Sequence, residues 1–114
     1  MAKFECNLQG NFDELLNELE SEILRGSMSA SLEDGSDYEN NGIRCAVRVY
    51  ERYSMMGGNR VSLNITLIGN YNDLFLTAIT SGGSQAILFK INTFGEEAFL
   101  NCVRDIVQNY KTKN

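Results

Sequence analysis

The sequence predicts an α+β fold in which a single antiparallel sheet of five to six strands carries two helices on one face. Three observations support this prediction. Two segments near the ends of the chain place their apolar residues on one side of a helix. Between them, apolar and polar residues alternate with a period of two, which is typical of half-buried strands. The connections between these alternating segments are short, and short connections join antiparallel neighbours.

The first strand and the first helix are predicted within residues 1–26. Residues 3–9, KFECNLQ, alternate apolar and polar side chains. Asn11 and Glu14 have the spacing of a helix N-cap and its capping-box acid, and Gly26 is a natural helix end. The apolar residues of this segment share one helical face: Phe12, Leu15, Leu16, Leu19 and Ile23.

Five further strands are predicted before the last helix. We expect them at residues 28–32, 43–53, 61–67, 74–80 and 85–91. The segment EDGSDYENNG is interpreted as a polar loop, and MMGGN and GNYND are interpreted as turns. Gly82-Gly83 is interpreted as a hairpin turn. A phosphate-binding loop is not expected there, because a predicted strand separates these glycines from the next helix.

The last helix is predicted to begin at Thr93, which has the spacing of a capping box with Glu96. Its apolar stripe consists of Phe99, Val103, Ile106, Val107 and Tyr110. The predicted element order is therefore β-α-β-β-β-β-β-α. A chain of 114 residues has the length of one domain, so we expect a single α+β domain over residues 1–114.

Composition narrows the classes of function. The net charge of −5 argues against a generic grip on nucleic acid or on an anionic membrane. No apolar run reaches a membrane-spanning length, and the first residues lack the pattern of a signal peptide, so we expect a cytoplasmic protein. The three cysteines, Cys6, Cys45 and Cys102, are too scattered for a disulfide framework or a zinc site, and we expect them in the core.

The sequence predicts a protein that is not an enzyme. It contains no histidine, the commonest general base and metal ligand, and no nucleophile–base pair, metal-ligand set or cofactor motif. We therefore expect neither a metal nor a cofactor. The acids of the first predicted helix are interpreted as solvent-exposed, and the alternative is a surface for a basic partner.

The predicted strand at residues 43–53 carries the most informative group of side chains. One of its faces bears Ile43, Cys45, Val47 and Val49. The other, interpreted as the outward face, bears Arg44, Ala46, Arg48, Tyr50 and Arg52. Guanidinium groups and an aromatic ring on an exposed sheet bind carboxylates, phosphates or stacked bases. Arg44, Arg48, Tyr50 and Arg52 are thus candidates for ligand or partner binding, and the alternative is that the arginines pair with neighbouring acids.

The predicted strands beyond residue 68 are apolar on both faces. A sheet with helices on one side normally has polar residues on the other, so the second face is expected to be covered. Two alternatives are a subunit interface and a curved sheet that encloses an apolar pocket. The candidate interface residues are Phe75, Ile79, Ile87 and Phe89.

The segment Ile79–Leu100, ITSGGSQAILFKINTFGEEAFL, together with the chain length and the element order, resembles a bacterial family of small α+β proteins of unknown function. The element order more distantly resembles that of helix-grip (START-like) proteins. That resemblance implies a curved sheet wrapped around the last helix, with a hydrophobic ligand cavity between them. This chain is shorter than those proteins, with one N-terminal helix where two are usual.

Three functions follow as hypotheses. The first is a non-enzymatic binding or assembly module that forms a homodimer through its apolar C-terminal strands. The second is a carrier of a small hydrophobic or acidic ligand of helix-grip type, in which Arg44, Arg48 or Arg52 binds the acid group. The third, an enzyme, has the least support in the sequence.

Overall fold

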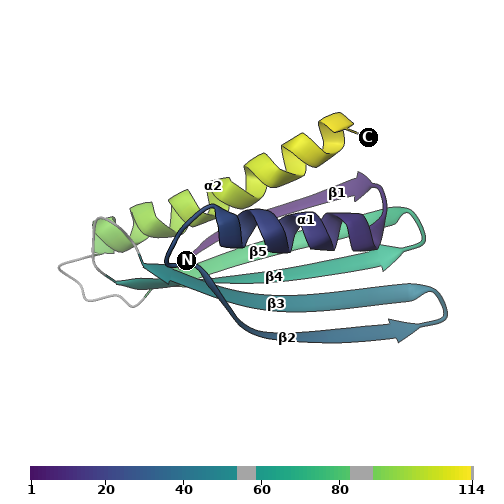
Figure 1. Cartoon of the computed structure of the whole chain (residues 1–114), viewed down its shortest axis with the longest axis horizontal. Coiled ribbons are helices and arrows are strands. Elements are labelled where there is room, and N and C mark those ends of the chain that lie inside the picture. The colour runs from purple at the N-terminus through teal and green to yellow at the C-terminus, as the bar shows by residue number, and fades with distance from the viewer. Residues whose placement is uncertain (54–58, 83–88, 114) are drawn as a thin grey trace.

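The structure is a computed structural model of residues 1–114. The structure describes residues 1–53, 59–82 and 89–113, with the backbone alone for residues 89–94. This part of the chain forms five strands and two helices in the order β-α-β-β-β-β-α (Figure 1). Their bounds are β1 Ala2–Gln9, α1 Phe12–Arg25, β2 Ser31–Asn40, β3 Ile43–Tyr53, β4 Arg60–Asn70, β5 Asp73–Gly82 and α2 Phe89–Lys113.

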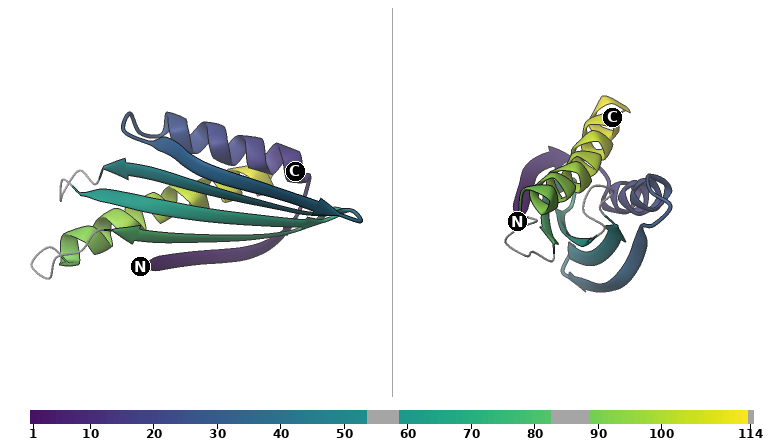
Figure 2. Two further views of the ribbon diagram at one scale, coloured as in Figure 1. Left: turned by 90° about the horizontal axis from the view of Figure 1, so that it is seen from below. Right: turned by 90° about the vertical axis from the view of Figure 1, so that its left-hand side faces the viewer.

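The five strands form one antiparallel sheet in the order β1-β5-β4-β3-β2. The first strand therefore pairs with the last one, and β2 lies at the opposite edge. Both helices lie on the same side of the sheet, and the sheet curves around them (Figures 1 and 2). We call this side the helix face and the other side the open face. The α+β architecture with one antiparallel sheet and two helices is confirmed.

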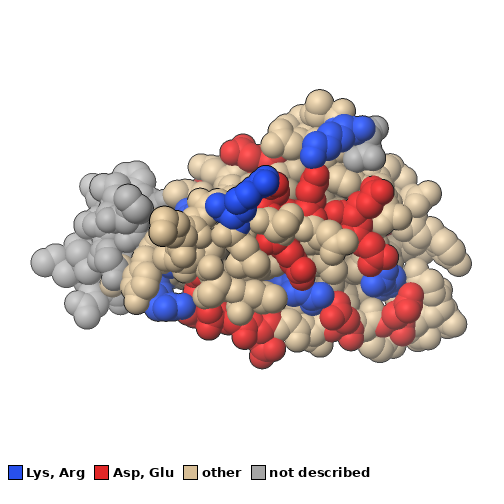
Figure 3. Space-filling model, viewed as in Figure 1, with Lys and Arg blue, Asp and Glu red and all other residues tan. Residues whose placement is uncertain are grey.

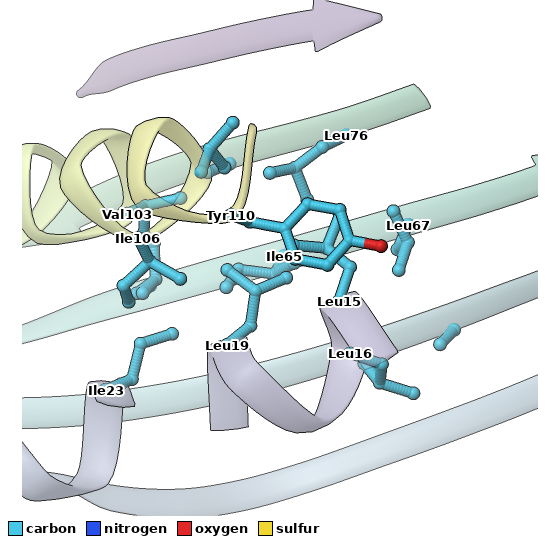
Figure 4. Packing of buried hydrophobic residues seen from close by; sticks show 14 of the residues in the cluster. Leu15, Leu16, Leu19, Ile23, Ile65, Leu67, Leu76, Val103, Ile106 and Tyr110 are labelled. Carbon is cyan, nitrogen blue, oxygen red and sulfur yellow. The ribbon is translucent and has the colours of Figure 1, made fainter. Parts of the chain in front are cut away.

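The core fills the space between the helices and the sheet (Figure 4). Its members come from every element except β2, and most are fully buried. Leu15, Leu19 and Ile23 of α1 meet Val103 and Ile106 of α2 above the strands. The apolar stripes predicted for the two helices are therefore the faces that pack on the sheet.

Local signals explain how several elements begin and turn. The Asn11 side chain accepts a hydrogen bond from the Glu14 amide at 3.0 Å, as expected of a helix N-cap. Asn41 and Gly42 both have positive φ angles, which suits the two-residue hairpin between β2 and β3. At Gly69 an added Cβ would lie 2.7 Å from Cδ2 of Phe12, so only glycine lets this ring pack against β4.

The segment read as a polar loop is instead a strand. Residues Ser31–Asn40 form β2, which pairs with β3 over its whole length apart from a bulge between Leu32 and Asp34. Residues 27–30 form turns rather than the start of a strand. The polar composition of β2 follows from its place at the edge of the sheet, where nearly every side chain is exposed.

The strand predicted at residues 85–91 is wrong for its last three residues. Residues 89–91 lie in the first turn of α2, and residues 83–88 are outside the described part of the chain. Thr93 is consequently an interior residue of the helix and cannot be its N-cap. The hairpin turn predicted at Gly82-Gly83 falls largely outside the described residues, since β5 ends at Gly82 and Gly83 is not described. Among the described residues, the sheet has five strands.

No helix in the described part of the chain is long and apolar enough to cross a membrane.

Candidate functional site

The arginine-bearing face of β3 is the helix face, not the outward one. Ala46 and Tyr50 on this face are fully buried, whereas Val47 and Val49 on the opposite face are half-buried. The candidate binding residues Arg44, Arg48, Tyr50 and Arg52 therefore lie beneath the helices. The predicted alternation of the two faces of β3 is correct, but the prediction assigned the wrong face to the core.

Arg48 lies at the centre of this arrangement and its side chain is 12% exposed. Its Nε donates to Glu20 of α1 at 2.7 Å, and its Nη2 donates to Asp37 of β2 at 3.0 Å. Its Nη1 donates to the backbone carbonyls of Ser36 and Val47. Burial alone would lower the pKa of Arg48, but the hydrogen bonds to Glu20 and Asp37 outweigh burial and raise it. Arg48 thus joins α1 and β2 to β3.

Arg44 repeats the arrangement nearer the β2–β3 hairpin. Its Nη1 donates to both carboxylate oxygens of Asp13 of α1 at 2.8 Å, and Glu39 of β2 lies 3.8 Å from its Nε. Its guanidinium carbon lies 4.3 Å from the centre of the Phe12 ring, within range of a cation–π contact. The hydrogen bond to Asp13 raises the pKa of Arg44. An anionic ligand at Arg44 or Arg48 would have to displace a carboxylate already bound there.

Arg52 differs from the other two arginines. It is half-buried, and its guanidinium lies 4.3 Å from the centre of the Phe99 ring of α2. Burial lowers the pKa of Arg52, and the nearby Cys102 offsets this in part. Within the residues that the structure describes, it forms no ion pair with a carboxylate. Of the three arginines, Arg52 has the chemistry best suited to an added anion.

Tyr50 is part of the core. Its ring is fully buried, and burial raises the pKa of its hydroxyl. The hydroxyl has no hydrogen-bond partner in the described part of the chain, and its electrostatic neighbours are Glu20 and Arg48. The side chain is inaccessible to a base or a ligand that approaches from solvent.

The open face of the sheet carries an apolar row across four strands. Tyr38, Cys45, Ile68 and Phe75 lie opposite one another on β2, β3, β4 and β5. Tyr38 is 62% exposed and Ile68 38% exposed, and the other two are half-buried. Val47 and Val49 extend the apolar surface along β3. No helix or strand among the described residues covers this row.

The candidate interface residues are only partly brought together. Phe75 and Ile79 share the open face of β5, where Ile79 is 39% exposed. Phe89 lies in α2 rather than in a strand, and Ile87 is outside the described residues. The apolar surface of the open face thus continues onto β3 and β4 rather than onto a strand after β5.

Acidic side chains gather on the other side of the molecule, over α1 and along β2 (Figure 3). Residues 12–40 contain nine of the 15 acids of the chain and one of its ten Lys and Arg residues.

An open groove of about 520 Å³ runs between α1 and α2, with Glu18, Glu22 and Asp105 on its walls and Cys102 among its lining residues. Among the described residues, no group of three or more acids and cysteines has the geometry of a metal site.

Comparison with known proteins places the chain in a family. Residues 1–111 match the family of unknown function DUF6054. The chain belongs to this family. The resemblance to a family of unknown function is thereby confirmed, whereas no curated protein and no solved structure matches the chain. Membership in DUF6054 assigns no activity or ligand, so a function has to be argued from the geometry of this chain.

Two groups of side chains at these surfaces were missed from the sequence. The first is the set of acids that bind the arginines, Asp13, Glu20 and Asp37. Asp13 and Glu20 are two helical turns apart, about 10 Å, and Arg44 and Arg48 are four strand residues apart, about 13 Å. This match of spacing and charge was the available signal. The second is the row on the open face, which needed the strand pairing to become visible.

Proposed function

We propose that this chain is a non-enzymatic assembly module that forms a homodimer through the open face of its sheet. The observation that carries the proposal is the apolar row of Tyr38, Cys45, Ile68 and Phe75, which crosses four adjacent strands. An antiparallel sheet with one solvated face normally alternates apolar and polar residues, so that its outer face is polar. A continuous apolar row on the outer face is typical of a surface that is buried in an assembly.

The size of the open face supports a second copy as the occupant. Strands spaced about 4.8 Å apart and about ten residues long present on the order of 600 Å² across β2–β5. A standard dimer interface buries about 800 Å² on each partner. Side-chain relief and the neighbouring turns add to the flat estimate, so the open face has about the area that a dimer requires.

The composition of the face also suits two identical surfaces. Its apolar row is flanked by uncharged polar residues such as Asn64 and Thr66 on β4. Its acids and bases lie toward the margins, with Lys3 and Glu5 on β1 and Glu51 near the end of β3. Two copies packed face to face would therefore desolvate few charges.

The test is the molar mass of the protein in solution, measured by light scattering during size-exclusion chromatography at micromolar concentration. We expect the wild-type chain at twice its mass of 12.8 kDa. The variant Ile68→Lys places a charge in the middle of the row, so it is expected to be a monomer. The matched control is Gln108→Lys, which adds the same charge at an exposed position of α2 and should remain a dimer. A monomeric wild-type chain, or a dimer that survives Ile68→Lys with its fold intact, would contradict the proposal.

A second candidate function is the binding of a small acid, and the environment of Arg52 favours it. A half-buried guanidinium stacked on Phe99 offers a charge that is only partly hydrated and that no described carboxylate neutralises. The ligand would be an acid with an apolar body, and the protein would be a carrier of helix-grip type. Native mass spectrometry of the purified protein should detect it as an added mass that Arg52→Gln loses and Arg60→Gln keeps, since Arg60 is paired with Glu51 near the surface. An identical spectrum for the two variants would exclude Arg52 as the anion site.

A further inference from the structure

We infer that the free edge of β2 binds an extended segment of another protein in which Lys or Arg alternates with apolar residues, and that this segment adds a sixth strand to the sheet. The inference does not require the dimer, because it rests on the backbone edge and the acids of β2, and it shares only Tyr38 with the proposed dimer surface. It rests on the exposure of β2, on its charge, and on the kind of strand that β2 already pairs with.

The edge is available along most of its length. β2 pairs with β3 on one side and is the last strand in the order of the sheet. Nine of its ten residues are exposed. Every second residue of an edge strand directs its N–H and C=O away from its neighbour, where they can pair with an incoming strand. The bulge between Leu32 and Asp34 interrupts one end, which leaves Asp34–Asn40 as the regular part.

The charge of β2 selects against a second copy of itself. The strand contains Glu33, Asp34, Asp37 and Glu39 and no basic residue. Antiparallel pairing of β2 with the β2 of another copy would place acids against acids, and like charges opposite each other destabilise a sheet. Charged edge strands commonly protect a protein from such pairing. The same charges attract a strand with the opposite sign.

The existing neighbour of β2 indicates the sequence that it accepts. β3 carries Arg44 and Arg48 on the helix face, where they pair with Glu39 and Asp37, and apolar residues on the open face. Asp37 and Glu39 remain 62% and 68% exposed in these pairs, so each can accept a second cation. A strand with the same alternation would repeat on the free edge the charge pairing that β3 makes on the other.

The other face of β2 favours apolar side chains at the alternate positions. Tyr38 lies on the open face and is 62% exposed. An incoming strand would place one side chain directly opposite its ring, and aromatic and β-branched residues form favourable cross-strand pairs.

The test uses a short acetylated and amidated peptide that alternates Lys and Val, added to the full-length protein labelled with nitrogen-15. We expect the amide resonances of β2 to shift more than those of β1, the other edge strand. Increasing the salt concentration should weaken binding, because the pairing is partly ionic and solvent-exposed. The same result is expected with the Ile68→Lys variant, which separates this inference from the proposed dimer.

Two controls distinguish strand addition from simple attraction between charges. A peptide of the same sequence with N-methylated amides along one edge keeps every charge but cannot form the ladder, so its Kd should be higher by about tenfold or more. Glu39→Lys should weaken binding several-fold, because Glu39 lies on the helix face, where the Lys residues of the peptide are placed, and is 68% exposed. Asp105→Lys, which makes the same charge change at an exposed position of α2, should leave binding unchanged. Equal binding of the methylated peptide, an equal effect of the two variants, or amide shifts confined to another surface would each overturn the inference. The comparison of the two peptides needs no variant, so it tests strand addition even if Glu39→Lys is unstable.

Discussion

The Arg48 guanidinium of β3 and the Glu20 carboxylate of α1 are 28 residues apart in the sequence and 2.7 Å apart in the structure. The same guanidinium binds Asp37 of β2. One side chain therefore attaches both the first helix and the edge strand to the middle of the sheet. This matters most for β2, which contributes no residue to the buried apolar core.

Replacement of Arg48 by Met is expected to destabilise the protein by about 1–3 kcal/mol. The substitution keeps much of the apolar stem but removes the hydrogen bonds to two carboxylates and two backbone carbonyls. Urea unfolding measures the loss, with an unchanged m-value if the fold is retained. Hydrogen exchange should accelerate at the amides of β2 more than at those of β4.

Arg25→Met is the matched control for this prediction. Arg25 also pairs with a glutamate, Glu22, but its side chain is 75% exposed and both residues are on the surface of α1. Exposed ion pairs contribute little, so no measurable change in unfolding is expected. If the two variants lose the same stability, the hydrogen bonds of Arg48 contribute no more to the free energy of unfolding than an exposed ion pair does.

Strand alternation alone could not reveal which face of β3 is buried. The run Ile43–Val49 has an apolar side and an arginine side, and hydrophobicity assigns the apolar side to the core. Ala46 and Tyr50 are the buried residues instead, and the arginines beside them are neutralised by acids of α1 and β2. The charge pairing across elements decides the register, and it becomes apparent only when the helix and the strand are considered together.

The two misassigned segments have different physical causes. β2 is rich in Asp, Ser, Gly and Asn, which have low strand propensity, and its pairing with β3 overrides that propensity. The Asn41-Gly42 turn was the signal that both flanking segments form a hairpin. The apolar run that ends at Ile91 is compatible with either a strand or a buried helix by periodicity alone, and its last residues are helical. The apolar patterns of both helices and the other strands, and the Asn11 cap of α1, were clear enough for a correct prediction, whereas the cap predicted at Thr93 was wrong.

Gly69→Ala is expected to cost about 1–3 kcal/mol, because the new Cβ would lie 2.7 Å from Cδ2 of Phe12. The cause can be tested with Phe12→Leu, which removes the ring that the methyl group meets. The double variant should then lose clearly less stability than the sum of the two single variants, as measured by urea unfolding. Additive losses would mean that the cost arises from the backbone of β4 rather than from the contact with Phe12.

Tyr110→Phe is expected to weaken the attachment of α2 to the start of α1. The Tyr110 hydroxyl accepts a hydrogen bond from the Asn11 amide at 2.9 Å and lies 3.3 Å from the Glu14 carboxylate. Without the Tyr110 hydroxyl, the partly buried Asn11 amide loses this hydrogen bond, at a cost of about 1–2 kcal/mol in the free energy of unfolding. Thermal unfolding measures the change against Tyr71→Phe, since the Tyr71 ring is 79% exposed in a turn. Equal melting temperatures for the two variants would contradict the proposed attachment.

The thiols of Cys6 and Cys102 are expected to ionise at a higher pH in the folded protein than in the unfolded chain. Burial raises the pKa of each thiol, and Lys111 and Arg52 respectively offset the shift in part. A raised pKa in the folded state means that the folded protein keeps its protons while the unfolded chain loses them. Stability should therefore be constant below the ordinary thiol pKa of about 8.5 and decrease as the pH rises above it.

Alkylation by iodoacetamide, followed by peptide mass spectrometry, gives the pH profile of each thiol separately. Only the thiolate reacts, so the midpoint of the rate profile reports the pKa, while restricted access lowers the rate at every pH without moving the midpoint. The midpoints of Cys6 and Cys102 should lie higher in the folded protein than in urea. The decrease in the urea midpoint above pH 8.5 should be smaller in the Cys6→Ser, Cys102→Ser double variant than in the wild type, because serine does not ionise there. Identical alkylation midpoints in the folded and unfolded protein would show that the burial of these thiols leaves their ionisation unaffected.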